Sequence, residues 1–135
     1  MIHDIEIQNK NNQLSTQHLD KTQIHPDEFL TLADLLVFRG QYQCHQIAYR
    51  FLDGEAQELN LTYQELDRRA SAIAEQLLII NAKGERALLI YPPGLDYIAG
   101  FFGCLYASVV AVPAYPPKRN QSISRLQAIV ADAQA

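Results

Sequence analysis

The spacing of hydrophobic residues predicts a helix where the chain first becomes apolar, and a β-hairpin after it. Three leucines recur three and four positions apart on one helical face: Leu32, Leu35 and Leu36. Thr31 can cap this helix with Asp34 at its third position, and Gly40 is expected to end it. Residues 47–52 and the ELNLTY run at 58–63 are rich in β-branched and aromatic residues. Because Asp53-Gly54 lies between them, a hairpin is expected.

The clearest helical signal follows Thr62, which forms the capping-box sequence T-x-x-E with Glu65. Asn81 or Gly84 can supply the left-handed residue that ends this helix. The charged run at 67–69 lies off the apolar stripe and is interpreted as a solvated helix face. The stripe itself consists of Tyr63, Leu66, Ala70, Ile73, Ala74, Leu77 and Leu78.

The second half of the chain alternates between apolar runs and helical patterns. Residues 86–91 and 109–113 are nearly continuous apolar runs, typical of strands covered on both faces. Pro92-Pro93-Gly94 breaks the first run and starts a helix, and Ser122 or Ser124 is expected to cap a last helix. The order is helix, two strands, helix, strand, helix, strand, helix, which predicts an α/β fold with a mostly parallel sheet flanked by helices. The last helical pattern indicates a further strand beyond it, so we expect an incomplete subdomain.

Length and composition fit one small domain with a polar lead-in. The chain has 135 residues, 48% of them hydrophobic, which is enough for a packed core. Residues 1–28 are polar without a sustained period and are expected to be flexible, which leaves 29–135 as the ordered portion. A net charge of −4 without a basic block argues against nucleic acid as a partner. Two cysteines and a start without a signal-peptide pattern favour a reducing, cytoplasmic location.

One uncharged stretch, residues 97–115, approaches the length of a membrane span, which needs about 20 apolar residues. Its first half is compatible with a helix, whereas its second half is β-branched and ends at Pro113. It also contains two glycines, a serine and three tyrosines. A buried helix followed by a buried strand explains this composition better, so we predict no membrane span.

Candidate catalytic and metal-binding residues are few. No glycine pattern forms a phosphate loop, and close packing explains Gly100 and Gly103 inside an apolar helix. The pair Cys44-His45, with His18 and His25 upstream, lacks the paired spacing of a zinc site and is interpreted as a surface pair. Cys104 lies among apolar residues and is expected to be a buried, inert thiol rather than a nucleophile.

Two YPP words follow the two predicted buried strands, at 91–93 and 115–117. They are compatible with polyproline ligands for a partner protein. Prolines that end a strand and shape the turn after it are the simpler interpretation, more so for the first word than for the second. The residues considered one by one therefore predict an α/β segment without a visible active site.

Longer words in the sequence resemble a known family, the adenylate-forming enzymes. LTYQELD at 61–67 resembles their LTYxEL motif, and LYASVVAVP at 105–113 resembles their motif L-x-A-G-x-x-x-V-P. Residues 84–122 are similar to the fatty acyl-AMP ligase branch in YPPGLD, FFGCLYA and VPAYPP. TLADLL and RLQAIVADA fit the same branch, and the resemblance covers about residues 29–135. Ser108 and Asn81 stand where the family usually has glycine, so both are expected to be left-handed, Ser108 at a cost below about 1 kcal/mol.

The resemblance implies the N-terminal portion of a ligase that activates a fatty acid with Mg-ATP. The acyl-adenylate then passes to the phosphopantetheine thiol of an acyl carrier protein, often feeding a polyketide or peptide synthase. The family's phosphate loop, adenylate pocket and catalytic lysine lie beyond the point that matches Ala135. None of its catalytic, cofactor-binding or metal-binding residues can therefore be assigned here, and the 135-residue chain alone is expected to be inactive.

Two alternatives remain open from the sequence. The first is a portion of an acyl-CoA synthetase, which differs in the acceptor thiol. The second is a non-catalytic module kept for binding or assembly. Such a module would present an open strand edge without its covering helices, which would favour self-association.

Overall fold

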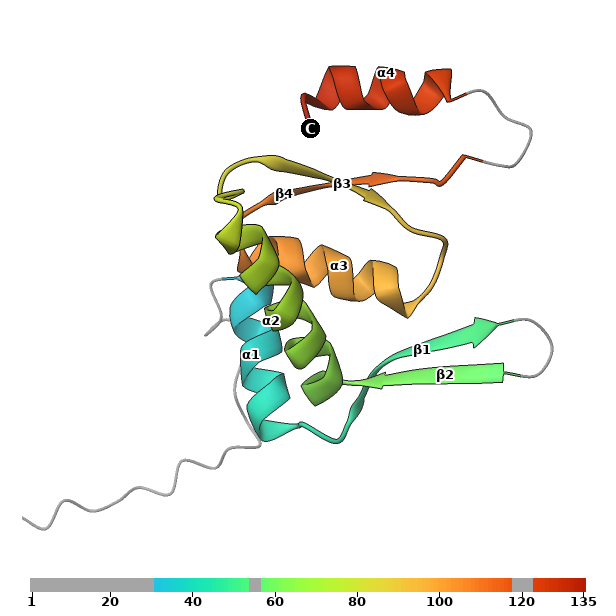
Figure 1. Cartoon of the computed structure of the whole chain (residues 1–135). Helices are drawn as coiled ribbons and strands as arrows, with labels where there is room; N and C mark the ends of the chain where they lie inside the picture. The colour runs from blue at the N-terminus through green and yellow to red at the C-terminus, as the bar shows by residue number, and fades with distance from the viewer. Residues whose placement is uncertain (1–30, 54–56, 118–122) are drawn as a thin grey trace, which may run out of the picture.

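The computed structural model describes residues 31–53, 57–117 and 123–135 (Figure 1). The predicted lead-in, 1–28, lies outside these residues. The order of helices and strands predicted from the sequence is confirmed. The elements are α1 (Leu32–Tyr42), β1 (Ile47–Asp53), β2 (Gln57–Thr62), α2 (Tyr63–Ile79), β3 (Arg86–Ile90), α3 (Leu95–Tyr106), β4 (Val110–Ala114) and α4 (Ser124–Ala133).

The strands form two separate pairs instead of one mostly parallel sheet. β1 and β2 are the predicted antiparallel hairpin, with Tyr49 opposite Leu61. β3 and β4 are parallel, with Arg86 opposite Val110. The hairpin pairs only with itself within the described residues. It is tied to the helical layer instead, because β2 ends at Thr62, the residue that caps α2.

The helices lie in two layers around the parallel pair. α1, α2 and α3 pack together, and α3 also lies against one face of β3 and β4 (Figure 1). α4 lies on the opposite face, where it contacts β4 (Figure 1). The uncharged run at 97–115 is therefore divided between α3 and β4, as the sequence predicts. Within the described residues, no helix combines the length and the apolar character that crossing a membrane requires.

The core lies mainly between α2 and α3. Gly103 sits where α3 approaches α2, and a Cβ atom built on it would lie 2.5 Å from Cγ2 of Ile73. A Cβ on Gly100 would lie 3.1 Å from the ring of Tyr91. Gly103 is therefore required for the close approach of α2 and α3, and Gly100 packs closely against Tyr91, so close packing explains both glycines, as the sequence predicts. The buried residues around this contact are Leu36, Leu61, Leu66, Ala70, Ala74, Leu89, Ala99, Cys104, Ala107 and Val109.

The two predicted capping boxes are present. The Asp34 N–H donates to the Thr31 hydroxyl at 3.1 Å, and the Thr31 N–H donates to the Asp34 carboxylate at 3.0 Å. Thr62 and Glu65 make the same reciprocal pair at 3.2 and 3.0 Å. Each box satisfies two N–H groups that the first turn of a helix leaves without intrahelical partners.

Two predicted helix ends are wrong. α1 does not end at Gly40 but continues to Tyr42, because Gly40 is buried against α2. A Cβ on Gly40 would lie 2.9 Å from Cβ of Asp67, so the glycine allows two helices to approach. Ser124 is the first residue of α4 and not its cap. The capping position is Ile123, which makes no side-chain capping bond. Ser122, the other predicted cap, lies outside the described residues.

Three residues in two connections have left-handed backbone where the sequence predicts it. Asn81 (φ 56°) and Gly84 (φ 82°) follow α2, and Ser108 (φ 56°) follows α3. The Gly84 N–H donates to the Ser108 carbonyl at 2.9 Å, which joins the two turns. Ser108 therefore adopts the conformation that a glycine would adopt with less strain.

The parallel pair is covered on one face more than on the other. Leu89 is buried, but Ile90 and Val110 are 41% and 53% exposed. The prediction that both strands are covered on both faces is therefore wrong for these residues. The reason is that α4 contacts β4 without burying any of its own residues.

Pro113 fits into β4 without loss of a bond to β3. The Val110 N–H donates to the Glu85 carbonyl at 2.8 Å, so Val110 faces the neighbouring strand. Because the N–H groups of successive strand residues point to opposite edges, those of Ala111 and position 113 face the outer edge of β4. A proline at that position therefore removes a donor only from the outer edge.

Candidate functional site

The carboxyl ends of β3 and β4 are the place where the topology of this chain predicts a ligand site. The two strands are parallel, so Ile90 and Ala114 end at the same edge. The chain then continues into α3 on one face and into α4 on the other (Figure 1). In open α/β sheets, ligands bind in the crevice outside the strand ends where the connections leave to opposite faces.

A cleft of about 670 Å³ lies at this edge. Four segments line it: residues 49–51 of β1, the turn from β3 into α3, the end of β4 with the residues after it, and the first turns of α4. Its volume is within the range of small-molecule sites, about 300–1,000 Å³. The lining residues are Tyr49, Arg50, Phe51, Tyr91, Pro92, Pro93, Gly94, Leu95, Tyr97, Ile98, Pro113, Ala114, Tyr115, Pro116, Pro117, Arg125, Leu126 and Ile129.

Both YPP words line this cleft. Each follows one of the two parallel strands, so the strand pairing brings 91–93 and 115–117 to the same edge. The sequence interpretation that these prolines end strands is confirmed, since β3 ends at Ile90 and β4 at Ala114. That interpretation did not recognise that the two words form one surface. The signal was available, because consecutive parallel strands end at a common edge.

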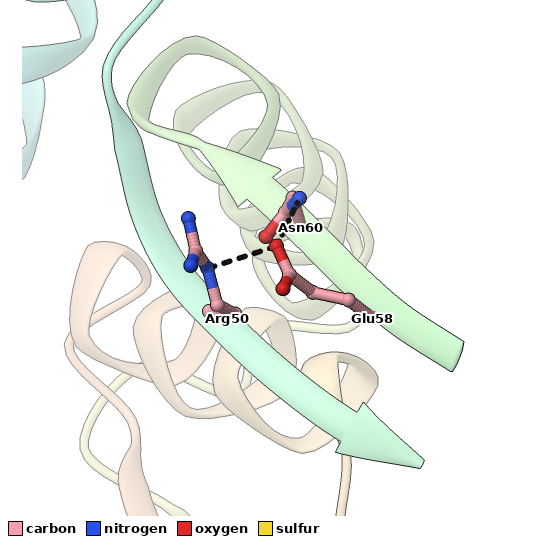
Figure 2. Close-up of polar contacts among 3 residues, drawn as sticks. All are labelled: Arg50, Glu58 and Asn60. Atoms are coloured by element: carbon pink, nitrogen blue, oxygen red, sulfur yellow. Dashed lines mark hydrogen bonds and ion pairs between the residues drawn. The ribbon is translucent and has the colours of Figure 1, made fainter. Parts of the chain in front are cut away.

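The charges of the lining residues are of one sign, carried by Arg50 and Arg125. Arg50 is paired: its Nε lies 3.0 Å from the Glu58 carboxylate, and the Asn60 amide donates to the same carboxylate at 3.1 Å (Figure 2). Both partners are largely exposed, so this pair orients Arg50 more than it stabilises the hairpin. No carboxylate of the described residues forms an ion pair with Arg125, which leaves its charge available to a ligand.

The entrance to α3 forms another part of the wall. Gly94 is the N-cap of α3, and a Cβ atom there would meet no other atom within 4 Å. Asp96 in the first turn of α3 is paired with Arg69 of α2 at 3.4 Å. Gly94 lines the cleft, and the space where its Cβ would stand is not filled by packing.

The cysteine and histidine candidates do not form a site in the described residues. Cys44 and His45 lie between α1 and β1, while His18 and His25 lie outside the described residues. No group of three His, Cys, Asp or Glu side chains converges within the described ranges. Cys104 is 1% exposed, and burial raises the pKa of its thiol. A thiol held in its protonated form is a poor nucleophile, as the sequence predicts.

Asp67 has a different role from the predicted one. The Tyr106 hydroxyl of α3 donates to its carboxylate at 2.7 Å, and its Cβ packs beside Gly40 of α1. Burial, and then the bond to Asp67, raise the pKa of Tyr106 far above its usual range. The interpretation of 67–69 as a solvated face is therefore wrong for Asp67, which connects three helices. Arg68 and Arg69 are exposed.

Comparison with known proteins shows the protein family to which the chain belongs. The family model described as AMP-binding enzyme matches residues 39–135. The chain therefore belongs to the AMP-binding enzyme family.

Its relatives within that family include fatty-acid ligases. The chain is 52% identical over 112 residues to the medium-chain-fatty-acid–[acyl-carrier-protein] ligase JamA of Moorena producens (strain JHB), covering 80% of this chain and 19% of that protein. It is 35% identical over 89 residues to the long-chain-fatty-acid–AMP ligase FadD32 of Mycolicibacterium smegmatis, covering 63% and 14%. The resemblance noted from the sequence motifs is thereby confirmed.

Solved structures give the same result for the fold. A fatty acyl-adenylate ligase from L. pneumophila, in complex with acyl adenylate and pyrophosphate, superposes with a TM-score of 0.75 at 36% identity. The match covers 83% of this chain and 20% of that chain. The α/β arrangement described above is therefore part of the adenylate-forming enzyme fold. The matched region makes up between 14% and 20% of the length of these relatives.

The AMP-binding enzyme family implies the use of ATP, but the chemistry of this cleft differs from that of a Mg-ATP site. Mg²⁺ prefers carboxylate oxygens, yet the cleft lining contains no Asp or Glu. Five of the lining residues are prolines, which lack the N–H groups that cradle phosphates. The cleft therefore does not fit Mg-ATP.

Proposed function

We propose that this chain serves as the N-terminal structural segment of an enzyme that activates a fatty acid with ATP. In that reaction the fatty-acid carboxylate attacks the α-phosphorus of ATP, which gives acyl-adenylate and pyrophosphate. The observation that carries the proposal is the 52% identity to an acyl-carrier-protein ligase over 80% of this chain. The TM-score of 0.75 to an acyl-adenylate ligase supports it independently of sequence motifs.

The proposal assigns the acyl group to the phosphopantetheine thiol of an acyl carrier protein, in a polyketide or peptide synthase. The similarity to JamA, an acyl-carrier-protein ligase, supports the carrier protein over CoA. A cytoplasmic location is part of the proposal and is supported by a sequence with only two cysteines, at positions 44 and 104. We further propose that the 135-residue chain alone forms no adenylate, since neither a phosphate cradle nor a magnesium site occurs among its described residues.

A chimera tests the segment's role directly. The 112 matched residues of JamA are replaced by the corresponding residues of this chain, and pyrophosphate exchange with a medium-chain fatty acid is measured. The proposal expects a chimera that exchanges pyrophosphate and loads a holo-carrier protein. A folded chimera without exchange contradicts the proposed role.

Two further arms complete the experiment. Offering CoA beside the carrier protein identifies the acceptor, and preferential formation of acyl-CoA contradicts that part of the proposal. Assaying the 135-residue chain by itself tests its predicted inactivity, which exchange above the no-protein blank would overturn.

A further inference from the structure

We propose that the outer edge of β3 pairs with the same edge of a second copy of this chain, in an antiparallel dimer centred on Leu88. The parallel strand pairs of the two copies would then form one four-stranded sheet, with β3 of each copy at the centre and β4 of each copy outside. The dimer is proposed for the 135-residue chain by itself and does not rest on the proposed function.

The outer edge of β3 presents a full row of backbone donors and acceptors. The Val110 N–H donates to the Glu85 carbonyl at 2.8 Å, so the backbone groups of the odd-numbered residues of β3 face β4. Those of Arg86, Leu88 and Ile90 therefore face outward, and each of the three can both donate and accept. Within the described residues β3 pairs with β4 alone, so this edge has no strand partner.

The other strand edges of the described chain are less suited to pairing. The outer edge of β4 lacks a donor at Pro113. The register of β1 is interrupted between Ile47 and Tyr49, and β2 carries the carboxylate of Glu58. Prolines, bulges and charged side chains are the features that keep edge strands from pairing. The β3 edge has neither a proline nor a bulge, and its central residue is Leu88.

The β3 edge is complementary to itself in the antiparallel direction. A twofold axis at Leu88 places Leu88 opposite Leu88 of the partner subunit, and Arg86 opposite Ile90 of the partner subunit. Each of these residue pairs can exchange two N–H···O bonds, because both members point outward. Opposite residues share a face of the sheet, so the apolar stem of Arg86 can cover the partner's Ile90. Ile90 is 41% exposed in the single chain, and no like charges are opposed among residues 86–90 in this register.

The assembly is expected to stop at two copies. An isologous contact uses each β3 edge once and closes, whereas a head-to-tail contact would continue. The edges that remain outside belong to β4 of the two copies, and each of them has the missing donor described above. A five-residue strand buries far less than the roughly 1,600 Å² of a standard interface, so the dimer is expected to be weak, with a Kd on the order of 100 µM.

Sedimentation velocity of the 135-residue chain, from about 5 to 500 µM, tests the stoichiometry. A monomer–dimer equilibrium without larger species is expected, and a chain that stays monomeric up to about 500 µM overturns the proposal.

Hydrogen exchange measured by NMR over the same concentrations tests the location. The amides of Arg86, Leu88 and Ile90 are expected to exchange more slowly as the dimer forms, whereas that of Ala111, on the outer edge of β4, is expected not to change. Equal protection of the three amides at every concentration would show that another segment covers the edge, and would overturn the proposal.

A charge exchange tests the register. Ile90→Lys places a lysine opposite Arg86 of the partner subunit at both ends of the contact, so the dimer is expected to weaken at least about tenfold. Adding Arg86→Glu to Ile90→Lys makes the opposed charges unlike and is expected to bring the Kd back to within about threefold of wild type. Leu52→Lys is the matched control, because Leu52 is 70% exposed on the hairpin and is not part of β3. Its Kd is expected to equal that of wild type.

Two results overturn the antiparallel register. The first is a folded Ile90→Lys chain that dimerises as strongly as wild type. The second is a folded double variant that does not recover. Circular dichroism establishes folding for each variant, and the exchange measurement on the wild-type chain decides the location without any variant.

Discussion

The contact between Gly103 and Ile73 predicts how sensitive the helical layer is to one methyl group. In Gly103→Ala, the new Cβ would lie 2.5 Å from Cγ2 and 2.7 Å from Cβ of Ile73. Ile73 cannot turn away, because a β-branched side chain in a helix has one strongly preferred χ1 rotamer. The α2 and α3 backbones must therefore separate, which costs about 1–3 kcal/mol as overpacking. Alanine in place of glycine inside a helix recovers about 1 kcal/mol. We expect a net destabilisation of roughly 1 kcal/mol.

Gly100→Ala is the matched control on the same helix. Its Cβ would lie 3.1 Å from the ring of Tyr91, and an aromatic ring at the edge of the cleft can shift by a few tenths of an ångström. The gain in helix propensity then dominates, so this variant is expected to be as stable as wild type or up to about 1 kcal/mol more stable.

Urea unfolding followed by far-ultraviolet circular dichroism separates the two variants. With a typical m-value of about 2 kcal/mol per molar urea, the midpoint of Gly103→Ala should fall by roughly 0.5 M while that of Gly100→Ala does not fall. The reasoning is refuted if Gly103→Ala unfolds at the same or a higher urea concentration than Gly100→Ala.

Three further predictions concern single contacts, each measured by urea unfolding. Thr62→Ala should destabilise the chain by about 1 kcal/mol. The hydrogen bonds from Thr62 lower the pKa of Glu65, so their contribution is present above the ordinary carboxyl pKa and is lost as pH falls through the lowered value. A Thr62→Ala penalty that is equally large above the ordinary carboxyl pKa and below the lowered pKa of Glu65 would contradict this. Tyr106→Phe should cost about 1.5 kcal/mol through its lost bond to Asp67, and no loss would contradict that bond's role. Ser108→Gly should stabilise by about 0.5–1 kcal/mol by relieving its left-handed strain, and a destabilised variant would refute that strain.

Features specified by neighbouring residues could be predicted from the sequence, and those specified by distant residues could not. Each capping box, at Thr31 and at Thr62, is formed by residues within four positions of one another. The local sequence is therefore enough to predict it. A glycine such as Gly40 often ends a helix, and the sequence alone predicts that role. Its actual role depends on Asp67, which packs beside it from another helix. Asp67 was likewise misinterpreted, because its partner Tyr106 is 39 positions away.

The candidate cleft shows the same limit. Each YPP word could be recognised alone as the end of a strand. Their joint surface depends on the parallel register of β3 with β4, and Arg125 joins them through the placement of α4. The predicted parallel sheet already placed the two words at one edge, whereas the placement of α4 is not encoded by local spacing, so Arg125 could not be assigned to this surface from the sequence.

The orientation of Pro113 also bears on how this chain behaves in concentrated solution. An exposed strand edge recruits other strands when every outward N–H can donate to them. The outer edge of β4 lacks one donor at Pro113, so an incoming strand would leave a carbonyl without its partner. We therefore expect this edge to be a poor template for cross-β growth, and replacing Pro113 with valine to accelerate thioflavin-positive aggregation.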